Sequence, residues 1–421
     1  MIRTSLIIGG GLLAALHLAA RPAHADDLSG VARWYMAEHA STAHSYGAEA
    51  MPPFARKYGV ACTTCHWPVP PKLNGFGQRF RWRGYRMENE VNQPLKADDV
   101  KNHLGVRAIA QGEYVTAKGA DEPLARELSN PTLSVFYVGA IGKRFGGWFE
   151  VGAYGDVLAQ VSSIWGNPVN YGGIRAGKIL WLTESGVAGF DRVVLPSQPL
   201  PLSDPLTNQV PLNLAEQKFA VEGYLVRGRD TKVSATLLNG YNLDAEGGYP
   251  EDKKFDVALS AQHLFGARGS GIMATFYRGA MGLRPDSLGQ PVDITAHYER
   301  YGLSGNAILG NAELLVGGVM GRDHGYAASG SLGKGWGFWG SALYNFPQTF
   351  LHAPLAIQGR YEYVNRDTQL SGQAVHRYVV GAALPLTDPY YLRLRVEYNH
   401  DHPTSGIGDL NGVRVQADLA W

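Results

Sequence analysis

The chain ends in Gly412-Val413-Arg414-Val415-Gln416-Ala417-Asp418-Leu419-Ala420-Trp421, where apolar and polar side chains alternate with a period of two. Successive side chains of a β-strand point to opposite faces, so this pattern predicts a strand with one apolar and one polar face. Residues 392–399 repeat it, with Leu, Leu, Val and Tyr alternating with Arg, Arg, Glu and Asn. Charges at every second position suit a water-filled lumen behind a lipid-facing wall. The end of the chain therefore predicts a transmembrane β-barrel.

The same kind of pattern recurs between residues 104 and 421. Bacterial outer-membrane barrels have an even number of strands. We expect an all-β fold, a 16-stranded transmembrane β-barrel, and a large soluble β-sandwich is the alternative. The predicted strands span 104–115, 132–141, 148–160, 171–180, 185–195, 217–227, 231–240, 254–265, 271–281, 292–302, 306–320, 334–345, 354–366, 374–386, 390–400 and 412–421.

Connections between the predicted strands alternate in length. Short turns are expected at 228–230, 267–269 and 386–388, and longer loops at 116–131, 241–253, 282–291 and 401–411. Short turns belong on the periplasmic side of such barrels and long loops on the outside. Residues 195–214 contain five prolines and cannot form a central strand. We expect this segment either to fold into the lumen or to form a long external loop.

The first 25 residues are typical of a secretory signal peptide. They combine Arg3, an apolar run over 6–20 and the small residues of Ala23-His24-Ala25, after which cleavage is expected. The remainder has no run near the roughly 20 apolar residues that a spanning helix needs. Glycine is frequent, at 53 of 421 residues, and the formal net charge of +1 does not suggest a nucleic-acid partner. These features agree with export to the bacterial outer membrane, with lipid around the barrel and a terminal aromatic residue, Trp421, on its last strand.

Residues 26–103 form a separate, partly helical segment around Cys62-Thr63-Thr64-Cys65-His66. A C-x-x-C-H sequence is typical of covalent c-type haem attachment, because two thiols at this spacing reach the two vinyl groups of one porphyrin. His66 would then be the proximal ligand of the haem iron. Cys62 and Cys65 are the only cysteines of the chain, so the motif predicts one covalent haem c. A redox disulfide and a zinc site are the weaker alternatives, because a thioredoxin-like context and further cysteines are missing.

The haem-binding segment is basic and aromatic, and has no Asp or Glu between residues 54 and 86. Its arginines could pair with haem propionates or with an acidic barrel wall, and both can hold at once. Met87 is our first candidate for the distal iron ligand, since a Met directly follows the block. An open sixth position is possible, and the other candidate ligands are Met36, His39, His44, Met51 and His103.

Three stretches, 54–59 (Phe-Ala-Arg-Lys-Tyr-Gly), 62–66 and 71–80 (Pro-Lys-Leu-Asn-Gly-Phe-Gly-Gln-Arg-Phe), together resemble the fused monohaem cytochrome c–porin family of the bacterial outer membrane. The best-known members of this family are outer-membrane Fe(II) oxidases. The resemblance implies a porin-like barrel over 104–421 with the haem segment at or in its lumen. It also implies electron uptake from an extracellular donor, Fe(II) first, and delivery to a periplasmic c-type cytochrome.

The leading functional hypothesis is therefore a one-electron conduit with Fe(II):cytochrome c oxidoreductase-type activity. The alternatives are a solute porin with a haem-bearing plug or redox gate, extracellular electron transfer with a non-iron donor or acceptor, and a peroxidase at an open iron. Carboxylates in the expected outer loops offer hard oxygen ligands for iron, although ordinary loop solvation explains them as well. These are Asp121, Glu122, Asp244, Glu246, Glu251 and Asp252.

Overall fold

The computed structural model has an all-β architecture with a few short helices. It describes residues 53–60, 62–67, 72–94, 102–119, 122–128, 131–152, 157–179, 194–203, 206–207, 212–215, 218–239, 255–282, 295–324, 333–346, 354–370, 372–385, 392–404 and 408–420. The signal peptide expected over 1–25 lies outside these residues. Among the described residues, no helix combines the length and the apolar character that crossing a bilayer requires.

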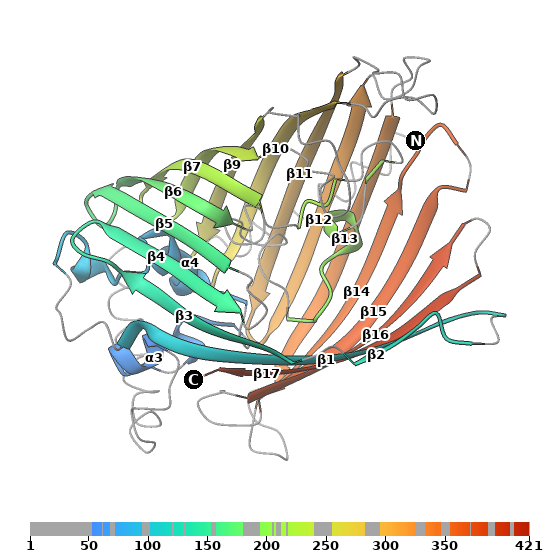
Figure 1. The fold of residues 1–421 in the computed structure, drawn as a ribbon, viewed down its shortest axis with the longest axis horizontal. Helices are drawn as coiled ribbons and strands as arrows, with labels where there is room; N and C mark the ends of the chain where they lie inside the picture. Colours follow the sequence, from blue (N-terminus) through green and yellow to red (C-terminus); the bar gives the residue numbers. More distant parts are fainter. Residues whose placement is uncertain are drawn as a thin grey trace.

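Seventeen strands form one antiparallel sheet that closes on itself through the pairing of β1 with β17 (Figure 1). The strands are β1 (Leu104–Ala117), β2 (Ala125–Leu128), β3 (Thr132–Ala140), β4 (Phe145–Gly152), β5 (Val157–Gly166), β6 (Tyr171–Ile179), β7 (Lys218–Arg227), β8 (Thr231–Asn239), β9 (Phe255–Phe265), β10 (Ser270–Gly282), β11 (Thr295–Leu309), β12 (Ala312–His324), β13 (Gly333–Phe346), β14 (Leu355–Asn365), β15 (Ala374–Pro385), β16 (Leu392–Pro403) and β17 (Leu410–Ala420).

The barrel has sixteen strand positions because β2 and β3 share one. Residues 104–109 of β1 pair with β3, and residues 112–115 pair with β2 on the same edge. The short β2 therefore extends the line of β3 and adds no position to the wall. The predicted 16-stranded barrel is confirmed, and the closed sheet rules out the soluble sandwich.

Three strand assignments from the sequence are wrong. The stretch 148–160 holds the end of β4 and the start of β5, which are separate strands. The strand predicted at 185–195 lies mostly outside the described residues, and β6 pairs directly with β7, which leaves no position for a strand between them. The turn placed between 302 and 306 lies instead at 310–311, between β11 and β12. The first two errors cancel, so the predicted total remained correct.

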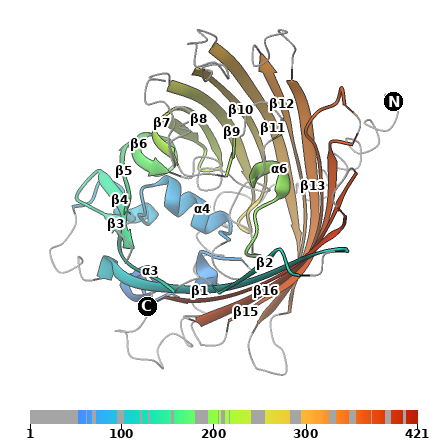
Figure 2. The ribbon, with the colours of Figure 1, turned by 45° about the vertical axis from the view of Figure 1, so that its right-hand side comes forward.

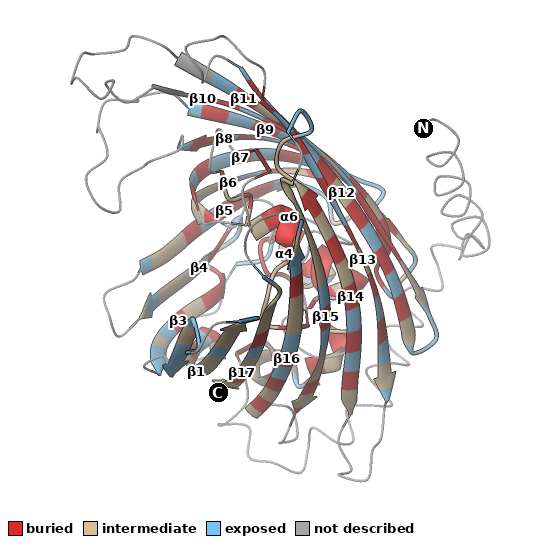
Figure 3. Ribbon diagram, turned by 90° about the vertical axis from the view of Figure 1, so that its right-hand side faces the viewer, coloured by how far each residue is buried: buried red, intermediate tan, exposed pale blue. Residues whose placement is uncertain are grey.

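Along the strands, buried residues that face the lumen alternate with exposed residues that face outward, and the buried set holds most of the charged side chains. β7 shows it without interruption, since residues 219, 221, 223, 225 and 227 are exposed and residues 218, 220, 222, 224 and 226 are buried. On β16 the inward Arg393, Arg395 and Glu397 are buried. Figure 3 shows this alternation along the strands in colour. The amphipathic pattern read at the end of the chain is therefore the division between lumen and lipid.

The two ends of the barrel differ in the length of their connections. We call short-turn end the end with the turns 141–144, 167–170, 228–230, 266–269 and 310–311, and long-loop end the end with the connections 240–254 and 283–294. β1 begins at the short-turn end, so the chain enters the barrel there. Short turns face the periplasm in outer-membrane barrels.

Short helical elements and one irregular segment fill part of the lumen (Figure 2). The N-terminal elements are α3 (Pro53–Tyr58), the 3₁₀ turn η1 (Cys62–Thr64), α4 (Gly75–Trp82) and η2 (Glu88–Glu90). The described parts of the proline-rich segment carry α6 (Leu200–Ser203), which contacts β12, β13 and β14. Leu202 and Leu206 are fully buried there. Of the two predictions for this segment, the one placing it in the lumen is confirmed.

Candidate functional site

The Cys62–His66 stretch forms one tight turn that is fastened to α4. The backbone N–H of His66 donates to Cys62 O at 2.9 Å. The Asn74 side-chain amide donates to Thr63 O at 3.1 Å and to Thr64 O at 3.0 Å, while its Oδ1 caps α4 by accepting from Gly77 N. An Asn before a helix is a common N-cap. The sequence identified the motif but not Asn74, whose capping position was the available signal.

The ring of His66 is oriented by a backbone carbonyl. Its Nδ1 lies 3.2 Å from Lys72 O, which also accepts from the Trp67 N–H at 3.1 Å. A carbonyl can only accept, so Nδ1 is the protonated nitrogen and the neutral ring carries its lone pair on Nε2. Metal-binding histidines commonly donate their second ring N–H to such a carbonyl, which fixes the tautomer and the ring orientation.

The surroundings of Cys65 do not favour redox exchange. Cys62 is buried and Cys65 is half-buried. Burial, with a smaller contribution from Cys62, raises the pKa of the Cys65 thiol to about 12. Redox-active C-x-x-C motifs have lowered thiol pKa values instead. No described set of three or more His, Cys, Asp or Glu side chains gathers as a metal site, so the zinc alternative gains no ligands from this part of the chain. The donor set fits a haem c.

The N-terminal segment is clamped to the short-turn end of the barrel. Arg79 Nε donates to Asp230 Oδ1 at 2.8 Å and Arg79 Nη2 donates to Gly266 O at 2.8 Å. Arg86 Nη2 donates to Gly142 O at 2.5 Å. Gly75 packs so closely on the 266–269 turn that a Cβ would lie 2.6 Å from the carbonyl oxygen of residue 267. Of the two roles that the sequence left open for the arginines, Arg79 and Arg86 perform docking to the barrel.

The turn between β7 and β8 carries backbone strain where it meets this segment. Gly228 and Arg229 have φ values of 62° and 70°, a left-handed conformation that a non-glycine residue adopts at an energetic cost. Arg229 Nε forms an ion pair with Glu88 Oε1 at 2.7 Å. The strained residue thus fastens η2 to the rim.

Aromatic side chains of the N-terminal segment pack against the wall formed by β3 and β4. Phe80 and Tyr85 form a buried cluster with Phe136 and Val138, and Met87 packs against it. The ring centroids of Phe54 and Phe80 are 4.8 Å apart in an edge-to-face arrangement, which is favourable for aromatic pairs. The cluster excludes water between the segment and the wall.

Trp67, the residue after His66, lies against the opposite side of the lumen. It packs on a cluster of Val194 from the proline-rich segment with Leu343, Ala356 and Ala383 from β13, β14 and β15. Lys72 Nζ forms an ion pair with Glu313 Oε1 of β12 at 3.1 Å, and both side chains are buried. The segment around the C-x-x-C-H motif therefore crosses the lumen and contacts both sides of the barrel.

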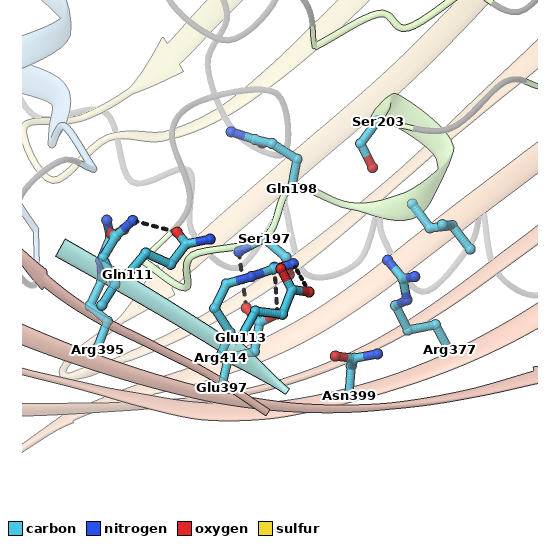
Figure 4. A network of polar contacts seen from close by, with 12 residues as sticks. Gln111, Glu113, Ser197, Gln198, Ser203, Arg377, Arg395, Glu397, Asn399 and Arg414 are labelled. Carbon is cyan, nitrogen blue, oxygen red and sulfur yellow. Dashed lines mark hydrogen bonds and ion pairs between the residues drawn. The ribbon is translucent and has the colours of Figure 1, made fainter. Parts of the chain in front are cut away.

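The proline-rich segment is held in the lumen by carboxylates of the wall. Glu397 accepts from Ser197 N at 3.0 Å, and Arg360 Nη2 donates to Ser197 Oγ at 2.7 Å. Figure 4 shows Ser197 beside Glu397 and Arg414 of β16 and β17. Further along, Thr207 hydrogen-bonds Asp323, which also pairs with Arg300 at 2.6 Å. Because these carboxylates are buried and paired, the segment is a fixed constriction of the barrel.

Comparisons with known proteins address the barrel. No family model and no curated protein match the chain. Among solved structures, outer-membrane expressed OmpT of Vibrio cholerae is 15% identical and covers 78% of this chain and 100% of that chain, with a TM-score of 0.53. The loop L8 deletion mutant of the same protein is 13% identical and covers 76% of this chain and 99% of that chain, with a TM-score of 0.52. The chain is a porin-like outer-membrane barrel. At such identities the porin likeness extends to the fold alone.

The candidate iron ligands occupy different surroundings within this porin-like barrel. Met87 lies in the aromatic cluster at β3 and β4, whereas His66 is followed by Trp67 on the other side of the lumen. His103 is fully buried, and its Nδ1 lies 2.8 Å from Val138 O. Both therefore stay predictions as distal ligands.

Several residues predicted from the sequence lie outside the described residues. Glu122 is described and exposed in the connection between β1 and β2. The rest of the predicted ligands and loop carboxylates, together with the terminal aromatic residue, cannot be placed: Met36, His39, His44, Met51, Asp121, Asp244, Glu246, Glu251, Asp252 and Trp421.

Proposed function

We propose that this protein is an outer-membrane electron conduit that oxidises Fe(II) through one covalent haem c and passes the electrons to a periplasmic c-type cytochrome. Cys62 and Cys65 would hold the haem, and His66 would be its proximal ligand. The observation that carries the proposal is the C-x-x-C-H turn inside the barrel, with the His66 ring held through Nδ1 by Lys72 O. Met87 is the first candidate for the distal position.

A bound haem c would supply a one-electron carrier, since its iron shuttles between Fe(III) and Fe(II). The protein's own residues bind, orient and shield this group. Asn74 and Lys72 O fix the turn and the His66 ring. The aromatic cluster around Phe80 and the packing of Trp67 on Val194 exclude water from the two sides of the segment. A dry, rigid surrounding lowers the reorganisation that accompanies electron transfer.

The contacts of Arg79 and Arg86 hold the N-terminal segment at the short-turn end, which sets the direction of electron flow in the proposed conduit. Because this end faces the periplasm, the haem segment lies on the side of the electron acceptor. A hydrocarbon core of about 30 Å separates it from the cell surface, so an extracellular donor has to approach through the barrel from the long-loop end. The proline-rich segment, fixed by Glu397 and Arg360, lies on that route.

An optical spectrum of the detergent-solubilised protein, before and after addition of Fe(II) at neutral pH, tests the proposal. We expect covalently bound haem with sharp low-spin bands, and reduction of that haem by Fe(II). A covalent haem that stays oxidised in Fe(II) would point to a non-iron donor or to a haem-gated solute porin. A five-coordinate, peroxide-reactive haem would favour the peroxidase, and a protein without haem would end the proposal.

A solute porin with a haem-bearing plug is the second candidate, and the porin-like fold is the observation that favours it. The fixed constriction argues against a freely open pore, since buried carboxylates anchor the proline-rich segment. Ion conductance in planar bilayers separates the two functions. A plugged electron conduit conducts little in either redox state, whereas a redox-gated porin changes its conductance when the haem is reduced.

Glu313→Gln is expected to raise the reduction potential of the bound haem by tens of millivolts. Lys72 and Glu313 form a buried ion pair, so the loss of the carboxylate charge frees the loop whose carbonyl orients His66. A weaker hydrogen bond from Nδ1 makes the imidazole a poorer donor to Fe(III). Redox titration measures the shift, with the exposed Glu122→Gln as control. Glu313→Asp should restore most of the native value, and an unchanged potential in Glu313→Gln would exclude this coupling.

A further inference from the structure

On the lipid-facing side of β10 to β13, successive rows of side chains differ in polarity toward the long-loop end. One row of directly opposed outward residues is apolar: Ala274, Leu303, Gly318 and Phe338. The next row toward the long-loop end is mainly aromatic: Phe276, Tyr301, Met320 and Trp336. Leu303 and Met320 are more than half exposed on this outer surface. The order matches a hydrocarbon band followed by the aromatic girdle at the membrane interface.

The row that follows is charged. Arg278 of β10 lies opposite Glu299 of β11, Glu299 opposite Arg322 of β12, and Arg322 opposite Lys334 of β13. Arg278, Arg322 and Lys334 are all exposed on the outer face. The row holds three cations and one carboxylate, so it has a net positive charge. On each strand it lies two residues beyond the girdle, a distance of about 7 Å. This is the depth of the lipid headgroups.

Two of the cations, Arg278 and Arg322, contact neighbouring outward side chains. Arg278 Nη1 is 4.0 Å from Glu299 Oε1, and Glu299 also accepts from the Tyr301 hydroxyl at 2.7 Å. The Arg322 guanidinium carbon lies 5.9 Å from the centroid of the Tyr301 ring, within the range of a cation–π contact. His297 and His324 are opposed in the next row out. The carboxylate of Glu299 thus pairs with Arg278, and the three cations outnumber it.

The other end of the same four strands has no such row. The outward residues near the short-turn end are apolar or aromatic: Leu309, Leu314, Tyr344 and Phe346. A need for solubility at the rims would place charges at both ends. Among the described outward residues of β10 to β13, the charged ones lie at the long-loop end, which faces the outer leaflet.

We propose that Arg278, Arg322 and Lys334 form a binding site for the phosphate groups of lipids in the outer leaflet. Guanidinium and ammonium groups make charge-assisted hydrogen bonds to phosphate, and basic clusters beside a lipid-facing surface bind anionic lipid headgroups. The girdle residues Tyr301 and Trp336 hold the acyl chains below. The ligand is a phosphorylated membrane lipid and not free phosphate, because the row continues a lipid-facing surface. This site does not depend on the haem.

Native mass spectrometry of the full detergent-solubilised chain, titrated with bis-phosphorylated lipid A at fixed ionic strength, tests the site. We expect Arg322→Gln with Lys334→Gln to weaken binding at least tenfold. Glu299→Gln should tighten it several-fold, because the shared carboxylate charge is lost, and a merely damaged barrel would not bind more tightly. Arg227→Gln is the matched control, an exposed outward cation at the short-turn end of β7.

Equal affinities for the native chain and the double variant would overturn the proposal. An equal loss in Arg227→Gln would also overturn it, by revealing general electrostatic attraction. Phosphatidylcholine should not compete with lipid A. If inorganic phosphate at millimolar concentration displaced lipid A, the site would be one for the free ion and the lipid assignment would be wrong. Where the double variant does not fold, as judged by its heat-modifiable mobility, Lys334→Gln alone is expected to weaken binding measurably.

Discussion

Replacing both Cys62 and Cys65 by Ala is expected to abolish covalent haem binding completely while the barrel still folds. Thioether bonds need the thiols, and the chain has no other cysteine that could substitute for them. The motif lies outside every strand of the sheet, and the segment stays clamped through Arg79 and Arg86. Haem staining of a denaturing gel measures the covalent haem, and heat-modifiable mobility with circular dichroism measures the barrel.

Thr63→Ala is the matched control for this pair, because it changes the same turn without removing a proposed haem attachment point. It should keep its covalent haem. A double cysteine variant that still carried covalent haem would contradict the proposed attachment through Cys62 and Cys65. Equal haem loss in Thr63→Ala would mean that the haem is lost because the turn is disturbed, and not because the thiols are removed.

The division of the barrel into lumen and lipid could be predicted from the sequence because it depends only on neighbouring residues. Alternation along a strand fixes which side chains share a face, whatever the rest of the chain does. Arg393, Arg395 and Glu397 were expected on the polar face, and all three are buried inward. The same local argument excluded residues 195–214, with their five prolines, from the central strands of the sheet.

The predicted strand boundaries were wrong where the alternation of side chains continued past the end of a strand or suggested a strand that the sheet does not contain. Between β4 and β5 the connection is only residues 153–156, so the apolar alternation on its two sides looked like one strand. The apolar run near 185–195 had the composition of a strand, yet β6 finds its partner in β7, which follows in sequence only after the lumen segment. Pairing partners are a property of the closed sheet and not of either stretch.

The contacts around the haem motif were beyond sequence reasoning for a related reason. Glu313, Asp230 and Gly142 hold the segment although they lie far from it in sequence. The sequence gives no sign that a lysine at 72 should meet a glutamate on β12, since many carboxylates face the lumen. Asn74 is different, because its position before α4 is a local signal that identifies a cap.

Asp418→Asn is expected to destabilise the barrel by about 3 kcal/mol or more, because it leaves arginines without a compensating negative charge. These arginines lie at the seam where β1 pairs with β17 and closes the sheet. Asp418 on β17 accepts from Arg107 of β1 at 2.9 Å and from Arg393 of β16, with Arg395 at 4.0 Å. One carboxylate thus compensates three guanidinium groups on two strands, β1 and β16. The variant keeps the shape of the side chain and loses only its charge.

Unfolding in denaturant, followed by tryptophan fluorescence in detergent, measures this loss. Asp409→Asn is the matched control, since Asp409 pairs with the exposed His402 near the other end of β17 and such a surface pair contributes little to stability. Equal stabilities for the two variants would show that the seam is closed by backbone pairing alone. The side chains that pair between β1 and β17 lie 301 residues or more apart along the chain. A large loss confined to Asp418→Asn would mean that charge inside the lumen selects these two strands for each other. Backbone hydrogen bonds cannot make that selection, because every strand offers the same ones.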